Sequence, residues 1–160
     1  MEIFLFKISD YDDLSQEFLN QYKKREISDL QRLRVHTLAY YLLDETLRKN
    51  FSIRNAEVEF VHKKPFLKSR EKFFSISHSN DYIAIVISDY NCGIDIEYKK
   101  ERTNYQKIAE RMRFKPCNSL DEFYKEWTLY EATYKLNEEV KSVKQFDIEL
   151  YSITAVSSNA

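Results

Sequence analysis

The sequence predicts an α+β fold in a single compact domain spanning residues 1–160. Two long segments carry apolar residues at helical spacing, and several shorter segments are rich in β-branched and aromatic residues, as strands are. At 160 residues, 43% of them hydrophobic, the chain is long enough for one core and short for two domains of ordinary size. With one glycine and two prolines, the sequence contains no linker-like stretch that would mark a domain boundary.

The first part of the chain is expected to open with a strand and continue with a long helix. Residues 1–8, MEIFLFKI, alternate loosely between apolar and polar side chains, which favours a strand. Residues 27–49 place leucines at helical spacing, and Ser28 or Asp29 is a plausible N-cap.

A hairpin and a further strand are predicted next. Residues 73–88, FFSISHSNDYIAIVIS, indicate two strands joined by the turn formers at 78–81. Residues 92–98 alternate as a half-buried strand does, so that Asp95 and Glu97 share one face.

Two helices and a strand-like tail complete the prediction. Residues 104–113 favour a short helix, and residues 119–137 a long one that begins with Ser119 and Glu122 in capping-box spacing. The tail at 146–158, FDIELYSITAVSS, alternates like a strand.

Composition excludes several classes of partner. The formal net charge of −1 gives no general attraction to nucleic acid or to an anionic membrane. No stretch approaches the roughly 20 apolar residues that a membrane span needs. The two cysteines, Cys92 and Cys117, are too few for a four-thiolate zinc site or a disulfide framework and favour a reducing compartment. We therefore expect a cytoplasmic protein with no nucleic-acid or membrane partner.

A carboxylate interrupts the apolar stripe of the second long helix. Glu131 falls near the middle of that stripe, and Lys135, one turn on, is the nearest candidate partner. Either the two residues form an ordinary ion pair at the margin of the stripe, or Glu131 requires a cation, a hydrogen-bond network or an opening to water, because burying an unpaired charge is costly. The stripe comprises Leu120, Phe123, Tyr124, Trp127 and Tyr134.

The acidic residues of the strand at 92–98 also allow two interpretations. Asp95 and Glu97 either lie on the solvent face of an edge strand or form a site for a hard divalent cation such as Mg²⁺, which prefers carboxylate oxygens. Gly93, the only glycine, comes directly before them, where a missing side chain lets the backbone bend or approach another element closely. His78, in the polar connection of the hairpin, is either a turn residue with no function or donates a hydrogen bond to an anion or pairs with its charge.

Four short motifs, taken in chain order, resemble the 4′-phosphopantetheinyl transferase superfamily. They are KKPFL at 63–67, FSISHS at 74–79, GIDIE at 93–97 and FYKEWTLYEATYK at 123–135. Because the SISHS element precedes GIDIE, the chain resembles the pseudo-dimeric, Sfp-like type. The resemblance implies two similar α/β halves, about 1–91 and 92–160, each a small, mainly antiparallel sheet packed on a long helix, with the second half reduced. It further implies a monomer with the active site between the halves.

In that family coenzyme A (CoA) is the donor, and its phosphopantetheine arm is moved to a serine of an acyl or peptidyl carrier protein. Adenosine 3′,5′-bisphosphate is released, and the reaction depends on Mg²⁺. By resemblance, Asp95, Glu97 and Glu131 hold Mg²⁺ against the CoA pyrophosphate. Lys135 contacts a phosphate of that group and pairs with Glu131. Glu131 is also the candidate base for the serine hydroxyl, so that Glu131, Lys135 and Asp95 form the expected catalytic set.

The resemblance also implies residues that bind CoA beyond its pyrophosphate. Lys64, His78 and the neighbouring Ser77 match positions that bind the 3′-phosphate and nearby parts of CoA. Arg32 matches an N-terminal basic residue near the same phosphate.

The chain departs from the family pattern at two places. Tyr130 stands where the family motif W-x-x-K-E-A has lysine, and the glycine-containing segment that usually follows Lys135 is absent from the sequence. These departures favour the alternative of a catalytically impaired relative that binds CoA or the carrier without transferring the arm. A metal-dependent nuclease or phosphatase that uses the Asp-x-Glu pair is a third reading, which leaves the order of the motifs unexplained.

Overall fold

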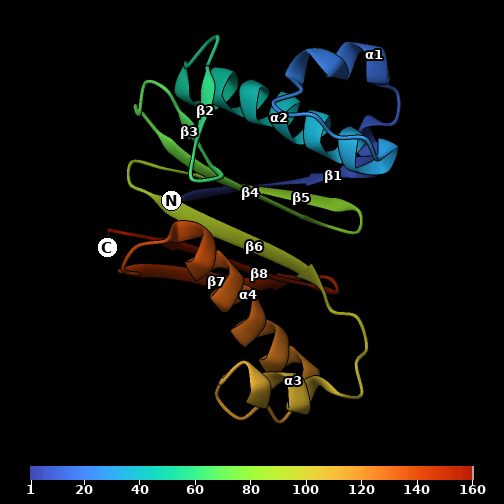
Figure 1. Cartoon of the computed structure of the whole chain (residues 1–160), viewed down its shortest axis with the longest axis vertical. Helices are drawn as coiled ribbons and strands as arrows, with labels where there is room; N and C mark the ends of the chain where they lie inside the picture. Colours follow the sequence, from blue (N-terminus) through green and yellow to red (C-terminus); the bar gives the residue numbers. More distant parts are fainter. Residues whose placement is uncertain (160) are drawn as a thin grey trace.

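The computed structural model describes residues 1–159 and has an α+β fold, as predicted (Figure 1). Its strands form three antiparallel sheets with the orders β1-β5-β4, β2-β3 and β6-β8-β7. Figure 1 shows α2 lying across the first of these sheets and α4 across the last, with β4 and β6 adjacent in the middle of the molecule. Within residues 1–159, no helix has both the length and the apolar character that crossing a membrane requires.

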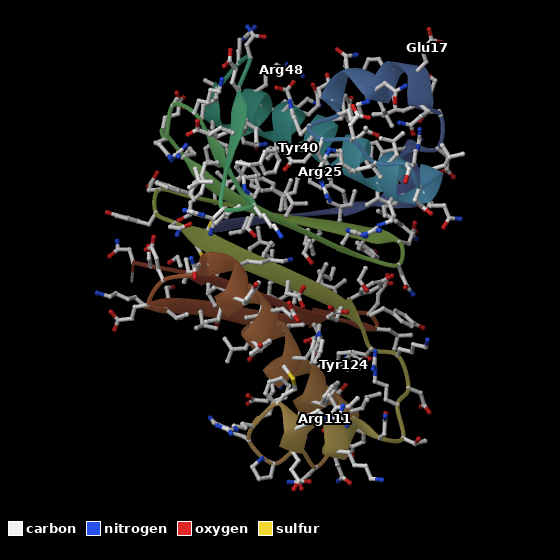
Figure 2. The ribbon with its side chains drawn as sticks, in the orientation of Figure 1. Glu17, Arg25, Tyr40, Arg48, Arg111 and Tyr124 are labelled. Carbon is white, nitrogen blue, oxygen red and sulfur yellow. The ribbon has the colours of Figure 1, made fainter. Side chains whose placement is uncertain are left out.

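The first three-stranded sheet packs on α2. Asp29 is the N-cap of this helix, because its carboxylate accepts a hydrogen bond from the Arg32 backbone N–H over 2.8 Å. Figure 2 shows Tyr40 between α2 and the sheet, where its ring meets that of Phe74 edge to face at 6.4 Å. The elements of this unit are β1 (Glu2–Lys7), η1 (Ile8–Tyr11), α1 (Gln16–Leu19), η2 (Asn20–Tyr22), α2 (Leu30–Phe51), β4 (Phe73–Ser79) and β5 (Tyr82–Ser88).

The turn of the β4–β5 hairpin is shorter than predicted. Ser79 pairs with Tyr82, so the strands continue to a two-residue turn at Asn80 and Asp81, where Asn80 has a φ of 46°. The prediction of a connection beginning at His78 was therefore wrong, and His78 is a strand residue.

A small hairpin, β2 (Val58–Val61) with β3 (Lys64–Leu67), was not predicted. Each strand has only four residues, and the turn uses His62 and Lys63 at φ values of 50° and 70° in place of the glycine or asparagine that usually signals such a turn. The hairpin carries Lys64 toward the second unit.

The second unit contains a three-stranded sheet with α4 packed against it. The predicted tail strand is in fact a hairpin, because Glu149, at a φ of 51°, and Leu150 form a turn. The central strand β8 is buried along its whole length. The elements are β6 (Cys92–Tyr98), α3 (Tyr105–Arg111), α4 (Leu120–Leu136), β7 (Ser142–Ile148) and β8 (Tyr151–Ser157).

The buried face of α4 differs from the predicted stripe. Tyr134 is 76% exposed, and Glu131 is half-buried at the margin of the contact with the sheet. Small side chains take the central places, because β6 and β8 approach the helix closely there. The buried residues of α4 are Phe123, Tyr124, Thr128, Ala132 and Leu136.

Gly93 makes this close approach possible. A Cβ atom at Gly93 would lie 2.2 Å from the carbonyl oxygen of Ala132 and 2.9 Å from the backbone nitrogen of Leu136. The expectation that the only glycine lets the backbone approach another element is confirmed, and that element is α4. The contact brings the last turn of the helix against the strand that carries Asp95.

Side-chain hydrogen bonds join the two large sheets. Alternate backbone N–H groups on the outer edge of β6 donate to serine hydroxyls of β4, so β6 is covered by the first unit along this edge. These bonds run from Ile94 to Ser75 over 3.2 Å, from Ile96 to Ser77 over 3.2 Å and from Tyr98 to Ser79 over 2.9 Å.

Candidate functional site

Asp95 lies buried between the two units. Only 4% of the residue is exposed, so the alternative of a solvent-facing edge strand is wrong. Its Oδ1 accepts a hydrogen bond from the Ser77 hydroxyl over 3.1 Å and lies 3.7 Å from the Lys135 ammonium. Within residues 1–159, its Oδ2 is a buried oxygen without a hydrogen-bond partner. One oxygen of the carboxylate is thus held by the protein, and the other is buried without a hydrogen-bond partner among the described residues.

The surroundings of Asp95 disfavour its negative charge. Burial raises the pKa of Asp95 to about 8. The positive charge of Lys135 opposes this rise, whereas the nearby carboxylates of Glu97 and Glu131 add to it. A divalent cation at this point would offset the repulsion among the three acids.

Glu97 and Glu131 flank Asp95 from two different elements. Glu97 is half-buried on β6, and burial raises its pKa, with a further rise caused by the charge of Glu131 on α4. The neighbouring side chains of Asp95 and Trp127 act in the opposite direction. The carboxylates that the sequence singled out on β6 and α4 therefore lie near one another.

The three acids have the right chemistry for Mg²⁺, although they do not converge on one point. Within the described residues, no group of three or more His, Cys, Asp or Glu side chains is arranged closely enough to hold one metal ion. The unpartnered Oδ2 of Asp95 and the mutual repulsion of the acids nevertheless fit a hard cation with oxygen ligands. The residues that could hold it are Asp95, Glu97 and Glu131.

Lys135 points at β6 from the last turn of α4. Its ammonium donates to the Ile94 carbonyl over 2.9 Å and to the Ile76 carbonyl over 3.4 Å. Among residues 1–159 its ion pair is with Asp95, and the predicted pair with Glu131 is not formed. The reason is the orientation of the helix, which turns Lys135 inward and leaves Glu131 at the flank. Burial lowers the pKa of Lys135.

His78 and Arg32 lie in the same region as Lys135. Arg32 is exposed in the first turn of α2, and His78 is exposed on β4. Partial burial of the ring lowers the pKa of His78, and the positive charges of Lys135 and Arg32 lower it further. These three side chains lie near enough to act on one another electrostatically and form a place suited to an anion.

Ser77 and Lys64 are bound within the protein. The Ser77 hydroxyl lies behind Asp95 in a residue that is 6% exposed, with both of its hydrogen bonds made to β6. The Lys64 ammonium donates to three backbone carbonyls, those of Cys92, Lys135 and Leu136. The roles in CoA binding expected for Ser77 and Lys64 stay predictions.

Sequence reasoning missed the part played by Ser75 and Ser79. The signal was present in the alternation of the three serines through FSISHS, which places their hydroxyls on one face of β4.

Tyr130, at the position of the family lysine, is 44% exposed and packs against Phe114 with ring centroids 5.9 Å apart.

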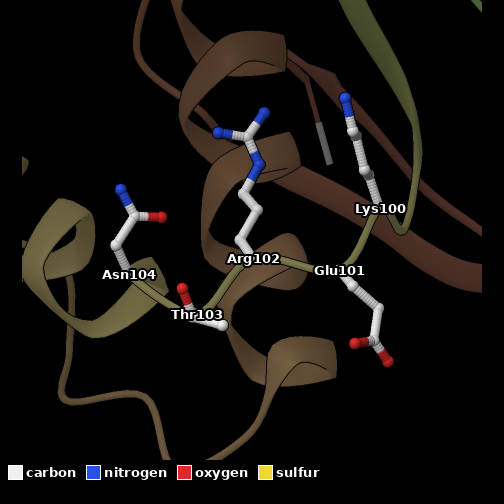
Figure 3. A pocket seen from close by; sticks show the side chains of 5 residues that line it. All are labelled: Lys100, Glu101, Arg102, Thr103 and Asn104. Atoms are coloured by element: carbon white, nitrogen blue, oxygen red, sulfur yellow. The ribbon is translucent and has the colours of Figure 1, made fainter.

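A surface cavity lies away from these residues. Figure 3 shows it on the segment between β6 and α3, where Arg102 points along α4 and Glu101 points away. Its volume is about 490 Å³, and the Arg102 Nε donates to the Tyr124 hydroxyl over 3.2 Å. A second cavity of about 220 Å³ lies between η2, α2 and β2. None of the predicted site residues lines either cavity.

Comparison with known proteins points to one family. No protein-family model matches the chain. A protein of Haemophilus influenzae named "Putative 4'-phosphopantetheinyl transferase" is 30% identical to it over 141 residues, which cover 78% of this chain. The chain spans 59% of the length of that relative. The similarity agrees with the motifs found in the sequence and supports the 4′-phosphopantetheinyl transferase superfamily.

Proposed function

We propose that this protein transfers the 4′-phosphopantetheine arm of CoA to a serine of an apo carrier protein, acyl or peptidyl, in a reaction that depends on Mg²⁺. Adenosine 3′,5′-bisphosphate is the other product. The proposal extends the name of the Haemophilus influenzae relative to this chain. The single observation that carries it is the buried contact of Asp95 with Lys135, flanked by Glu97 and Glu131.

The residues near this contact separate into an acidic and a basic part. Asp95, Glu97 and Glu131 would hold Mg²⁺, which supplies positive charge against the CoA pyrophosphate when it is bound. Lys135 binds a phosphate oxygen from the other side and stabilises the charge that grows as the P–O bond breaks. His78 and Arg32 bind the 3′-phosphate, since both lie close enough to Lys135 to share one extended anionic ligand.

The incoming serine requires a base. Glu131 is half-buried on the flank of α4 and, as noted above, is not ion-paired with Lys135. Its carboxylate is therefore available to accept the proton of the serine hydroxyl while the oxygen attacks phosphorus. The proton leaves the hydroxyl as the new P–O bond forms and the bond to the adenosine bisphosphate breaks.

The same proposal covers the organisation of the molecule. We take the two units, each a three-stranded sheet with a long helix, as the two similar halves at about 1–91 and 92–160, in a monomer with the site between them. The second half is the reduced one. The cytoplasmic location expected from the sequence stays a prediction.

The test is a transfer assay with intact mass as the readout. The protein is incubated with CoA, Mg²⁺ and several apo carrier proteins, both acyl and peptidyl. The expected result is a carrier whose mass has increased by one phosphopantetheinyl arm, only when CoA and Mg²⁺ are both present. A matched carrier with its acceptor serine replaced by alanine must stay unmodified.

Calorimetric titration with CoA distinguishes the alternative. If CoA binds and no carrier gains mass, the protein is a catalytically impaired CoA-binding relative. Tyr130 favours that reading, because an exposed tyrosine there does not supply the fixed positive charge of the family lysine. If neither CoA nor a carrier binds, both readings fail.

A further inference from the structure

Side chains cover the outer edge of β6. Its N–H groups are bound by the serines of β4, and two of its carbonyls accept from lysine ammonium groups. Lys64 donates to the carbonyl of Cys92 over 3.0 Å, and Lys135 donates to that of Ile94 over 2.9 Å. Because Cys92 and Ile94 are two residues apart on one strand edge, the two lysines are neighbours along it.

Lys64 also binds the end of α4. Its ammonium donates to the Lys135 carbonyl over 2.6 Å and to the Leu136 carbonyl over 3.3 Å. The last carbonyls of a helix have no partner within the helix, and a cation there also interacts favourably with the helix dipole. The three N–H groups of Lys64 thus face three backbone carbonyls on two elements.

This arrangement leaves Lys64 poorly placed to bind a phosphate. Lys64 is half-buried, and this burial lowers the pKa of its ammonium. To bind a ligand it would have to release carbonyls at the end of α4. One of those carbonyls belongs to Lys135, whose side chain contacts Asp95.

We propose that Lys64 is a positioning residue that fixes the last turn of α4 to β6 and thereby holds the Lys135 ammonium against Asp95. The proposal rests on the transferase function proposed above. It differs from the role that the resemblance implies for Lys64, which is to bind CoA at the 3′-phosphate or nearby parts of the molecule. The two roles predict different kinetics with CoA and with 3′-dephospho-CoA.

The kinetic experiment compares the wild type with Lys64→Met, with Lys63→Met as the matched control on the exposed neighbouring lysine. Positioning predicts that Lys64→Met lowers kcat at least tenfold. The preference for CoA, measured as the ratio of kcat/KM for CoA to kcat/KM for 3′-dephospho-CoA, should stay within twofold of the wild-type ratio. Lys63→Met should behave as the wild type. In a Lys135→Met background, Lys64→Met should lower kcat no further, because its effect acts through Lys135.

A second variant covers the case in which Lys64→Met does not fold. Lys64→Arg keeps the positive charge, but a planar guanidinium does not direct three N–H groups onto the same carbonyls. A positioning role predicts a folded Lys64→Arg protein with a lowered kcat. An unchanged kcat together with a lost preference for CoA, in either variant, overturns the proposal and assigns Lys64 to the phosphate.

A spectroscopic readout is independent of activity. In the nuclear magnetic resonance spectrum of the protein without ligand, the Nζ signal of Lys135 is assigned by its loss in Lys135→Met. The chemical shift of this signal should change in Lys64→Met and in Lys64→Arg, and stay unchanged in Lys63→Met. An unshifted resonance overturns the positioning role. If the wild type transfers no phosphopantetheinyl arm but the Lys135 signal shifts as expected, the transferase function is rejected and the positioning role of Lys64 stands.

Discussion

The Ser77 hydroxyl donates to Asp95 Oδ1 over 3.1 Å, and it accepts the backbone N–H of Ile96 over 3.2 Å. One small side chain on β4 therefore ties the first sheet to β6 and fixes which oxygen of Asp95 is left without a partner. Ser79 makes the same kind of backbone contact, with Tyr98, at 2.9 Å.

Ser77→Ala should weaken both the fold and the candidate metal site. Removing the hydroxyl leaves a buried carboxylate oxygen and a backbone N–H with fewer partners, at a cost of about 1–3 kcal/mol in the free energy of unfolding. Asp95 also loses its orientation, so we expect weaker binding of Mn²⁺, measured by electron paramagnetic resonance as a stand-in for Mg²⁺. Urea unfolding gives the stability.

Ser79→Ala is the matched control for this prediction. It removes a hydroxyl from the same strand with no loss of a carboxylate contact, so it should reduce stability by about 1 kcal/mol and leave Mn²⁺ binding unchanged. Equal effects of Ser77→Ala and Ser79→Ala on Mn²⁺ binding would contradict the role given to Ser77.

Gly93→Ala should destabilise the second unit by at least about 2 kcal/mol. The added methyl would meet backbone atoms of Ala132 and Leu136, which cannot rotate away as a side chain can. The helix would have to move from β6, and Lys135 would move with it. Urea unfolding monitored by far-ultraviolet circular dichroism measures the loss. A midpoint equal to that of the wild type would show that α4 does not pack this closely on β6.

Glu131→Gln should abolish transfer and weaken the dependence on Mg²⁺. The amide keeps the size of the side chain but removes a charged ligand and the proposed base. Intact mass of the carrier measures transfer over a series of Mg²⁺ concentrations. Glu126→Gln, a half-buried glutamate on the same helix, is the control and should retain activity. Undiminished turnover in Glu131→Gln would show that the site is wrongly assigned.

Stability should fall as the pH decreases from about 6.5 toward 4, in part because of His36. Burial, followed by the charges of Arg25 and Lys24, lowers the pKa of His36 to about 4. Its Nε2 accepts the backbone N–H of Lys24 over 3.0 Å, which requires the neutral ring. Between pH 4 and 6.5 the unfolded state therefore binds more protons than the folded state, so acid favours unfolding.

Urea unfolding at pH 7.0 and 4.5 tests this dependence on pH. The difference in the free energy of unfolding between the two pH values should be smaller in His36→Gln, whose amide oxygen can accept the same hydrogen bond without titrating. His62→Gln, at an exposed position, should retain the difference seen in the wild type. An equal difference in His36→Gln would assign the acid sensitivity to other groups.

The sequence alone determined the elements whose signals are local. The bounds 92–98 of β6 are those predicted, and α4 begins where Ser119 accepts the N–H of Glu122. A cap or an alternating strand depends on residues within one turn or a few positions, which a single sequence displays. Local signals failed where turns used unusual residues, as at Glu149, which splits the tail into two strands.

Only the tertiary structure decided what the predicted side chains touch. Asp95 was expected either on the solvent face of an edge strand or in a cation site, and it is enclosed because β4, from an earlier part of the chain, covers the edge of its strand. Lys135 pairs with Asp95 although Glu131 is one turn away on its own helix, because Gly93 brings the helix and β6 together. Lys64 meets carbonyls more than 70 residues away in the chain. Burial and partner choice depend on which distant segments pack together, so the same acidic and basic residues acquire their electrostatics only in the folded chain.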